Sequence, residues 1–170
     1  MASDIHAVAL RALSRRALSR REISERLDRK GFGQAAIRAE LARLAAAGLL
    51  DDAELARAVV RSQLADGRGR RAMAITLLRR GVDREAASSA LAAIGDDDDA
   101  AALARALARA ARKYPGFRRL PQVRRKVIRY LLARGFGVAA ISRALAGDAG
   151  EDADAVEVEL VQSGDPQDLP

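Results

Sequence analysis

The sequence predicts an all-α protein made of three tandem three-helix repeats. The first observation is composition: of 170 residues, 49% are hydrophobic but only 3% are aromatic, so the core has to be built from Ala, Leu, Ile and Val. The second is local preference, because Ala, Leu and Arg lead the helix propensity scale and no long β-branched run indicates a buried strand. The third is an internal repeat centred on three glycines.

The repeated segments align without gaps around Gly31, Gly81 and Gly135. They read ISERLDRKGFGQAAIRAEL at 23–41, MAITLLRRGVDREAASSAL at 73–91 and VIRYLLARGFGVAAISRAL at 127–145. Each has apolar residues eight and four positions before the glycine and one and ten positions after it, and a basic residue directly before it. Apolar residues four apart share a helix face, and a left-handed glycine commonly ends a helix. Each copy is therefore predicted to contain a helix, a glycine turn and a second helix.

A further helix is expected before each of these pairs. In the last unit it is indicated by an apolar stripe at helical spacing over 103–114. The predicted repeats therefore span residues 1–48, 49–95 and 96–147. The repeat glycines are 50 and 54 residues apart. Such a period is typical of arrays whose units stack on their neighbours, so we expect an elongated, curved array.

Several residues mark the expected helix ends. Ser19 and Glu22 have the spacing of a capping box. Asp52 is expected to be the N-cap of the first helix of the second repeat, and Pro121 suits a first helical position. The acidic run 96–99 favours the start of another helix. Helix stops are expected at Gly48, Gly67, Gly95 and Gly147.

Catalysis finds little support in the residue types present. The chain has no cysteine, so disulfides and thiolate metal sites are excluded, and its one histidine, His6, is expected on the surface. The contiguous carboxylates at 96–99 splay apart on a helix and are not expected to bind metal. No enzyme activity and no cofactor are therefore predicted. With no signal peptide and no apolar stretch of roughly 18–20 residues, the chain is expected to be cytoplasmic and to avoid membranes.

Charge is distributed unevenly along the chain. Residues 1–147 contain all 30 Lys and Arg but only 15 of the 23 acids, a net charge of +15, whereas 148–170 contain eight acids and no base. A body this basic predicts an anionic partner. The tail at 148–170 is expected to be disordered. Its acids could either fold over the basic face or act only as a solubilising segment.

Basic residues gather at or before the middle helix of each predicted repeat. Arginine suits phosphates and carboxylates, and recurrence at one repeat position favours a binding stripe over solvated helix faces, which remain the alternative. Tyr114 and Tyr130 lie on apolar stripes, which favours core roles over base stacking. The candidate partner-binding or nucleic-acid-binding residues are Arg15, Arg16, Arg20, Arg21, Arg68, Arg70, Arg71, Arg79, Arg80, Arg118, Arg119, Arg124, Arg125, Lys126 and Arg129.

Several short motifs follow one another in a specific order. GLLDD at 48–52 is followed by Arg61-Ser62, by Gly67-Arg68-Gly69 and by 78–81, while 27–32 and 130–136 carry related motifs at the two ends. In this order, over about residues 5–147, they resemble the RecX regulatory proteins of bacteria. The resemblance implies three winged-helix-like units without strands. The chain departs from the family pattern at Leu55, Val59 and Arg70.

The same resemblance implies a function. RecX proteins bind the RecA recombinase, lie along the groove of its filament on single-stranded DNA, and inhibit its recombinase, ATPase and coprotease activities. The expected partners are therefore RecA and its nucleoprotein filament, with single- or double-stranded DNA as a further contact. The alternative is a non-sequence-specific DNA-binding helical protein that acts without RecA. In both cases we expect a monomer.

Overall fold

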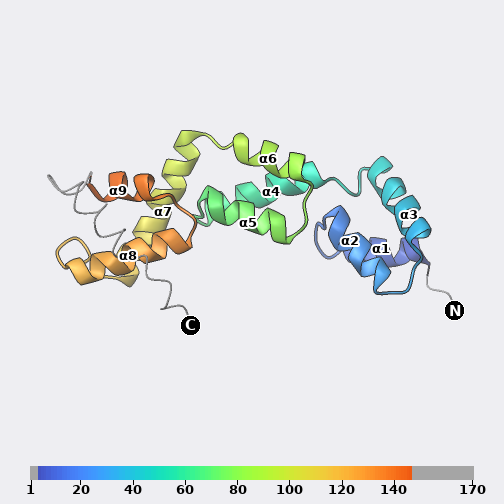
Figure 1. The fold of residues 1–170 in the computed structure, drawn as a ribbon, viewed down its shortest axis with the longest axis horizontal. Coiled ribbons are helices and arrows are strands. Elements are labelled where there is room, and N and C mark those ends of the chain that lie inside the picture. The colour runs from blue at the N-terminus through green and yellow to red at the C-terminus, as the bar shows by residue number, and fades with distance from the viewer. Residues whose placement is uncertain (1–3, 147–170) are drawn as a thin grey trace. The chain divides into compact units, whose positions relative to one another are not determined.

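The computed structural model describes residues 4–146, and the predicted tail and Gly147 lie outside the described residues. Residues 4–146 form helices and no strand, which confirms the all-α prediction (Figure 1). Each sequence repeat contributes three helices. The helices are α1 (Ile5–Leu13), α2 (Arg20–Asp28), α3 (Gln34–Ala46), α4 (Asp52–Ala65), α5 (Arg70–Arg79), α6 (Arg84–Ala92), α7 (Asp96–Lys113), α8 (Pro121–Ala133) and α9 (Val138–Ala146).

The described residues form two compact units. The first combines the described part of Met1–Ser62 with Ala74–Ile94, and the second combines Gln63–Met73 with the described part of Gly95–Pro170. The middle repeat is therefore divided, because the segment that joins α4 to α5 belongs with the third repeat. The elongated, curved shape expected for the array stays a prediction.

The positions that define the sequence repeat are core positions. The residues eight and four before the glycines are 0% exposed in all three copies: Ile23, Leu27, Met73, Leu77, Val127 and Leu131. The leucine ten after the glycine is buried in the third copy, at Leu145, but half-buried at Leu41 and Leu91. The last repeat position therefore lies at the edge of the core in the first two copies.

The glycine turns have the predicted left-handed geometry. Gly31, Gly81 and Gly135 have φ values of 83°, 61° and 87°. After Gly31, the N–H of Phe32 donates to the carbonyl of Leu27 (3.3 Å) and the N–H of Gly31 donates to that of Asp28 (2.8 Å). This is a Schellman pattern, which satisfies two carbonyls that the ended helix leaves open.

The capping predictions are confirmed at some helix ends and wrong at others. Ser19 and Glu22 form the capping box, and Pro121 opens α8. Gly48 and Gly67 have the left-handed φ values, 69° and 65°, of helix stops. Gly95, expected to be a stop, is instead the N-cap of α7, whose first turn holds the four aspartates at 96–99.

The N-cap prediction for Asp52 is also wrong, because its neighbour Asp51 caps α4. The Oδ1 atom of Asp51 accepts hydrogen bonds from the N–H groups of Ala53 (2.8 Å) and Glu54 (3.0 Å). Asp52 is buried and accepts instead from the N–H groups of Arg20 (2.9 Å) and Asp83 (3.0 Å). It thereby ties the start of α4 to the start of α2 and to the N-cap of α6.

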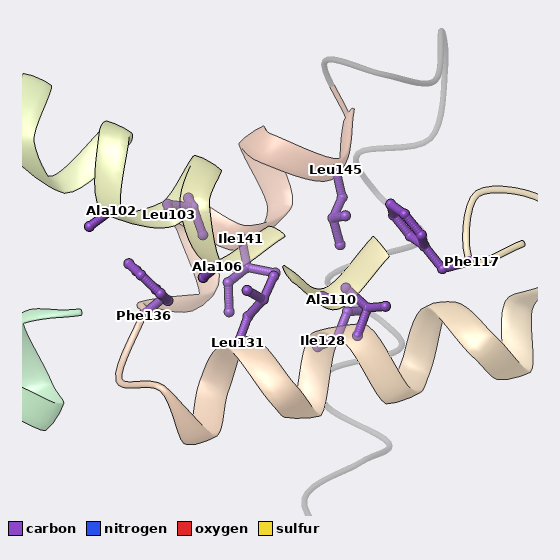
Figure 2. Packing of buried hydrophobic residues seen from close by; sticks show 11 residues of the cluster. Ala102, Leu103, Ala106, Ala110, Phe117, Ile128, Leu131, Phe136, Ile141 and Leu145 are labelled. Carbon is purple, nitrogen blue, oxygen red and sulfur yellow. The ribbon is translucent and has the colours of Figure 1, made fainter. Parts of the chain in front are cut away.

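Two separate buried clusters of aliphatic and alanine side chains form cores, one in the first repeat and one in the third. The helices α1, α2 and α3 pack around the first cluster, and α7, α8 and α9 around the second. Figure 2 shows the second cluster, in which Phe136 and Phe117 add aromatic surface to Leu131, Ile141 and Leu145. The predicted aliphatic core is therefore present in both.

Tyr114 and Tyr130 pack against the second cluster, which agrees with the predicted core roles. Their rings form a T-shaped pair with centroids 6.2 Å apart. Lys113 Nζ lies 5.4 Å from the centroid of Tyr114, and the Arg134 guanidinium lies 4.8 Å from that of Tyr130. The rings are thus engaged within the protein and do not form an open stacking platform.

The surface placement predicted for His6 is only partly confirmed. Its side chain is only 26% exposed, and Nδ1 lies 2.7 Å from Oε1 of Glu40, a carboxylate that is itself 5% exposed. This hydrogen bond joins α1 to α3 and gives the buried Glu40 carboxyl group a partner, which a buried polar group needs. None of the helices within residues 4–146 is long and apolar enough to cross a bilayer.

Candidate protein and nucleic-acid interface

The first unit contains a junction between two sequence repeats. The turn that ends α5 lies against the start of α2, where Ser19 Oγ donates to the carbonyl of Arg80 (2.5 Å). The Arg80 guanidinium donates in return to the carbonyl of Ala17 (2.7 Å) and to the Glu22 carboxylate (3.0 Å). A basic residue at a repeat position is therefore used here to join repeats.

The second unit contains a junction of the same design. The N–H of Gly69, directly before α5, donates to the carbonyl of Arg134 at the end of α8 (2.9 Å). The Arg134 guanidinium donates to the carbonyls of Asp66 (2.8 Å) and Gly67 (3.1 Å). Like Arg80, Arg134 directly precedes a repeat glycine, and like Ser19, Gly69 directly precedes a middle helix. The two junctions thus use equivalent positions of successive repeats.

The close approach at the second junction requires glycine. A Cβ atom added to Gly135 would lie 2.3 Å from the backbone nitrogen of Ala72, whereas one added to Gly81 would meet only the exposed side chain of Arg21, which can move away. At Gly31, which takes part in no such junction, an added Cβ would meet nothing within 4 Å. Gly135 therefore serves packing as well as chain reversal.

Glu22 is the electrostatic centre of the first junction. Its carboxylate accepts from the guanidinium groups of Arg80 and Arg16, both at 3.0 Å, and from the N–H of Ser19 at 2.9 Å. Burial acts to raise the pKa of Glu22, but these hydrogen bonds outweigh burial and lower the pKa from 4.5 to about 2. Glu22 is thus held in its charged form to stabilise the junction.

The predicted binding residues fall into different environments. Four of them form ion pairs within a unit: Arg16 and Arg80 with Glu22, Arg21 with Glu25, and Arg70 with Asp99. Arg124 is half-buried, and the remaining ten are exposed. These ten are Arg15, Arg20, Arg68, Arg71, Arg79, Arg118, Arg119, Arg125, Lys126 and Arg129, and the ion-paired Arg16 and Arg21 are exposed as well.

The densest group of bases lies before and along α8, and we call it the α8 cluster: Arg118, Arg119, Arg124, Arg125, Lys126 and Arg129. No acidic residue occurs from 100 to 146, a stretch that contains twelve Lys and Arg. Arg129 is one helical turn from both Arg125 and Lys126, and like charges at this spacing repel. The bases also crowd the start of α8, the end at which a helix disfavours cations. Helix stability therefore does not explain the cluster.

The sequence analysis did not predict one surface feature, an exposed apolar face on α5. Leu78 on α5 is 73% exposed, and Ile75, one turn earlier on the same helix, is 44% exposed. The two side chains lie one helical turn apart and so form one exposed apolar face of α5. The sequence does indicate that Leu78 points away from the core, because the repeat assigns the neighbouring Leu77 to the core and adjacent helical residues point about 100° apart.

Metal ligation has no visible basis in the part of the chain that the structure describes. Within residues 4–146, no three His, Cys, Asp or Glu side chains come together in a way that could hold an ion. The aspartates at 96–99 occupy the first turn of α7, where the helix dipole favours them.

Comparisons with protein-family models and with solved structures identify the same family. Models of the first, second and third three-helix domains of RecX match residues 6–44, 51–91 and 96–145, well over half of the chain. The crystal structure of RecX from Lactobacillus salivarius is similar with a TM-score of 0.72 and 22% identity, over 87% of this chain and 97% of that one. A crystal structure of regulatory protein RecX gives 0.67 and 21%, over 81% and 71%. No curated protein sequence matches significantly.

Proposed function

Because this chain belongs to the RecX family, we propose that it regulates the RecA recombinase. It binds RecA and the RecA filament on single-stranded DNA in the cytoplasm, blocks filament growth, and lowers ATPase, strand-exchange and coprotease activity. It acts as a monomer that occupies its partner, without catalysis and without a cofactor. The observation that carries the proposal is the α8 cluster, a group of bases of which all but Arg124 are exposed, with no carboxylate in the same stretch of chain.

Two kinds of surface support a partner that contains both nucleic acid and protein. The α8 cluster suits phosphates, because each phosphate that a Lys or Arg neutralises releases a bound counterion. Leu78 and Ile75 suit a protein surface instead, since exposed apolar side chains gain little from a phosphate backbone. A nucleoprotein filament offers both kinds of contact.

The α8 cluster also favours a second candidate function, non-sequence-specific DNA binding without RecA. This alternative predicts tight binding to DNA alone, with an affinity that falls steeply as salt is raised. Under the RecA proposal, binding to a DNA-bound RecA filament is stronger than binding to the same DNA without RecA. Measuring both affinities at one salt concentration separates the two functions.

The direct test is the DNA-dependent ATPase activity of RecA with this protein titrated in. RecA should hydrolyse ATP more slowly as the protein is added, and the loss should deepen when the protein is added before the filament has grown. An ATPase rate that is unchanged at saturating protein would overturn the proposal. Binding to DNA alone in the same buffer would then support the alternative.

A further inference from the structure

We propose that the acidic segment 148–170 binds the α8 cluster of its own chain and competes there with nucleic-acid phosphates. The segment lies outside the described residues, but its composition is known: eight acids and no Lys or Arg. The inference goes beyond the regulation of RecA and concerns this chain alone. Its experiments contain no RecA, so their outcome is independent of the function proposed above.

Charge favours the second unit as the binding surface. The described residues of that unit, 63–73 and 95–146, contain 15 bases and 5 acids, a net charge of +10. Those of the first unit, 4–62 and 74–94, contain 15 bases and 10 acids, a net charge of +5. Mutual repulsion within the α8 cluster is relieved when carboxylates approach it.

The path of the chain places the segment close to this surface. Leu145, in the last turn of α9, belongs to the same buried cluster as Phe117, and Figure 2 shows both at one end of that cluster. Phe117 directly precedes Arg118, the first base of the α8 cluster. The chain therefore leaves α9 near the start of α8.

The segment is also long enough to follow α8. A helix rises 1.5 Å per residue, so the 13 residues of α8 extend over roughly 20 Å. An extended chain spans up to about 3.3 Å per residue, so six or seven residues reach that far. The 23 residues of the segment can thus bring several carboxylates to the bases at the same time.

A groove in the same unit is the other surface to consider for binding the acidic segment. The charged residues that line the groove argue against it. It has a volume of about 1020 Å³, and Leu103 and Phe136 are among the apolar residues that line it. Asp96, Asp97 and Asp99 line it together with Arg70 and Arg143. Three aspartates repel an acidic segment, whereas the α8 cluster has no acid in its stretch of chain.

Paramagnetic relaxation in the full-length chain tests the contact directly. Because the sequence contains no cysteine, Ser163→Cys provides a single site for a nitroxide label. At about 0.1 M salt the label should broaden the backbone amide signals of residues 118–129 more than those of α2 or α3. At about 1 M salt, where the Debye length falls to about 3 Å, the broadening should disappear. Signals of 118–129 that stay sharp at low salt, or broaden no more than those of α2, would overturn the proposal.

Matched variants locate the contact on the α8 cluster. Arg119→Gln, Lys126→Gln and Arg129→Gln together should abolish the broadening. The control carries the same number of substitutions on exposed bases of the first unit, Arg29→Gln, Lys30→Gln and Arg38→Gln. It should leave the broadening intact. Equal loss in both triple variants would show a general charge effect and contradict a specific contact.

Competition is tested with a dye-labelled oligothymidylate and a full-length variant whose eight tail acids are changed to Asn or Gln. If the segment covers the cluster in about nine of ten molecules, neutralising it should tighten oligonucleotide binding about tenfold. In the α8 triple variant the same neutralisation should give no such gain. An unchanged affinity, or an equal gain in the α8 triple variant, would overturn the competition.

Discussion

At the scale of single residues, the basic position directly before the repeat glycine differs among the three repeats: it joins two repeats in the second and third copies but not in the first. Arg80 and Arg134 directly precede repeat glycines and donate to carbonyls in the preceding repeat. Lys30 is at the equivalent position of the first repeat but is exposed and forms no ion pair within residues 4–146. An arginine count along the sequence therefore overstates the surface that is open to a partner, because junction arginines are already engaged.

Gly135, at the second junction, makes the first prediction. Gly135→Ala forces a side chain into the left-handed region and against the Ala72 backbone, so it should lower the free energy of unfolding by roughly 2–4 kcal/mol. Gly31→Ala is the control: its φ is also positive but its surroundings are open, so only about 1 kcal/mol is expected. Urea unfolding measures both, and equal losses would refute the close approach at the second junction.

Glu22 makes the second prediction. Its pKa is lowered from 4.5 to about 2, so its contribution to stability is complete above pH 4.5 and is lost as the pH falls towards 2. Each pKa unit corresponds to 1.36 kcal/mol, so Glu22→Gln should cost up to about 3 kcal/mol at neutral pH. The difference between wild type and variant should shrink as the pH falls from 4.5 to about 2. A difference that does not change over this range would contradict the role of the charge.

At the scale of helices, the sequence predicts well what depends on neighbouring residues. The apolar residues before each glycine are buried, and the glycine turns have the expected left-handed φ, because helix face and C-cap are local properties. Of two adjacent aspartates, however, it is Asp51 and not Asp52 that caps α4. That choice depends on contacts of Asp52 with Arg20 and Asp83, which are 32 and 31 residues away in the chain.

The exposed face of α5 makes the third prediction. Leu78→Ser should leave the stability nearly unchanged, because the leucine is 73% exposed, but should weaken the inhibition of RecA several-fold. Leu10→Ser is a matched control on α1, where the leucine is less exposed, at 37%. Half-inhibitory concentrations in the RecA ATPase assay give the answer. If both variants inhibit as wild type does, the α5 face makes no contact with RecA.

At the scale of the whole molecule, each junction joins residues that are far apart in the chain. Arg80 and Glu22 are separated by 58 residues, and Arg134 and Asp66 by 68. Periodicity within a repeat cannot reveal such pairs, since they depend on how successive repeats meet. For the same reason the candidate site could be predicted as a set of clusters, but not divided into junction arginines and exposed ones.

The residue before the middle helix of the third repeat leads to a prediction of the oligomeric state. Leu120 directly precedes α8, at the position that Ser19 and Gly69 hold before α2 and α5. It has no hydroxyl to donate, and its N–H already bonds to the carbonyl of Gly116 (3.0 Å). The third repeat therefore lacks the junction donor, and we predict a monomer. Sedimentation equilibrium should give a mass near 18.1 kDa, and a concentration-dependent rise in mass would contradict this.

The central claim is that the α8 cluster carries the regulation of RecA, and one comparison tests it most directly. RecA's DNA-dependent ATPase is titrated with wild type, with Arg119→Gln/Lys126→Gln/Arg129→Gln, and with the control Arg29→Gln/Lys30→Gln/Arg38→Gln. If the three bases of the α8 cluster neutralise phosphates, as the proposal requires, their loss should weaken inhibition by about tenfold or more, whereas the control should inhibit as wild type does. Identical inhibition by all three proteins would contradict the account.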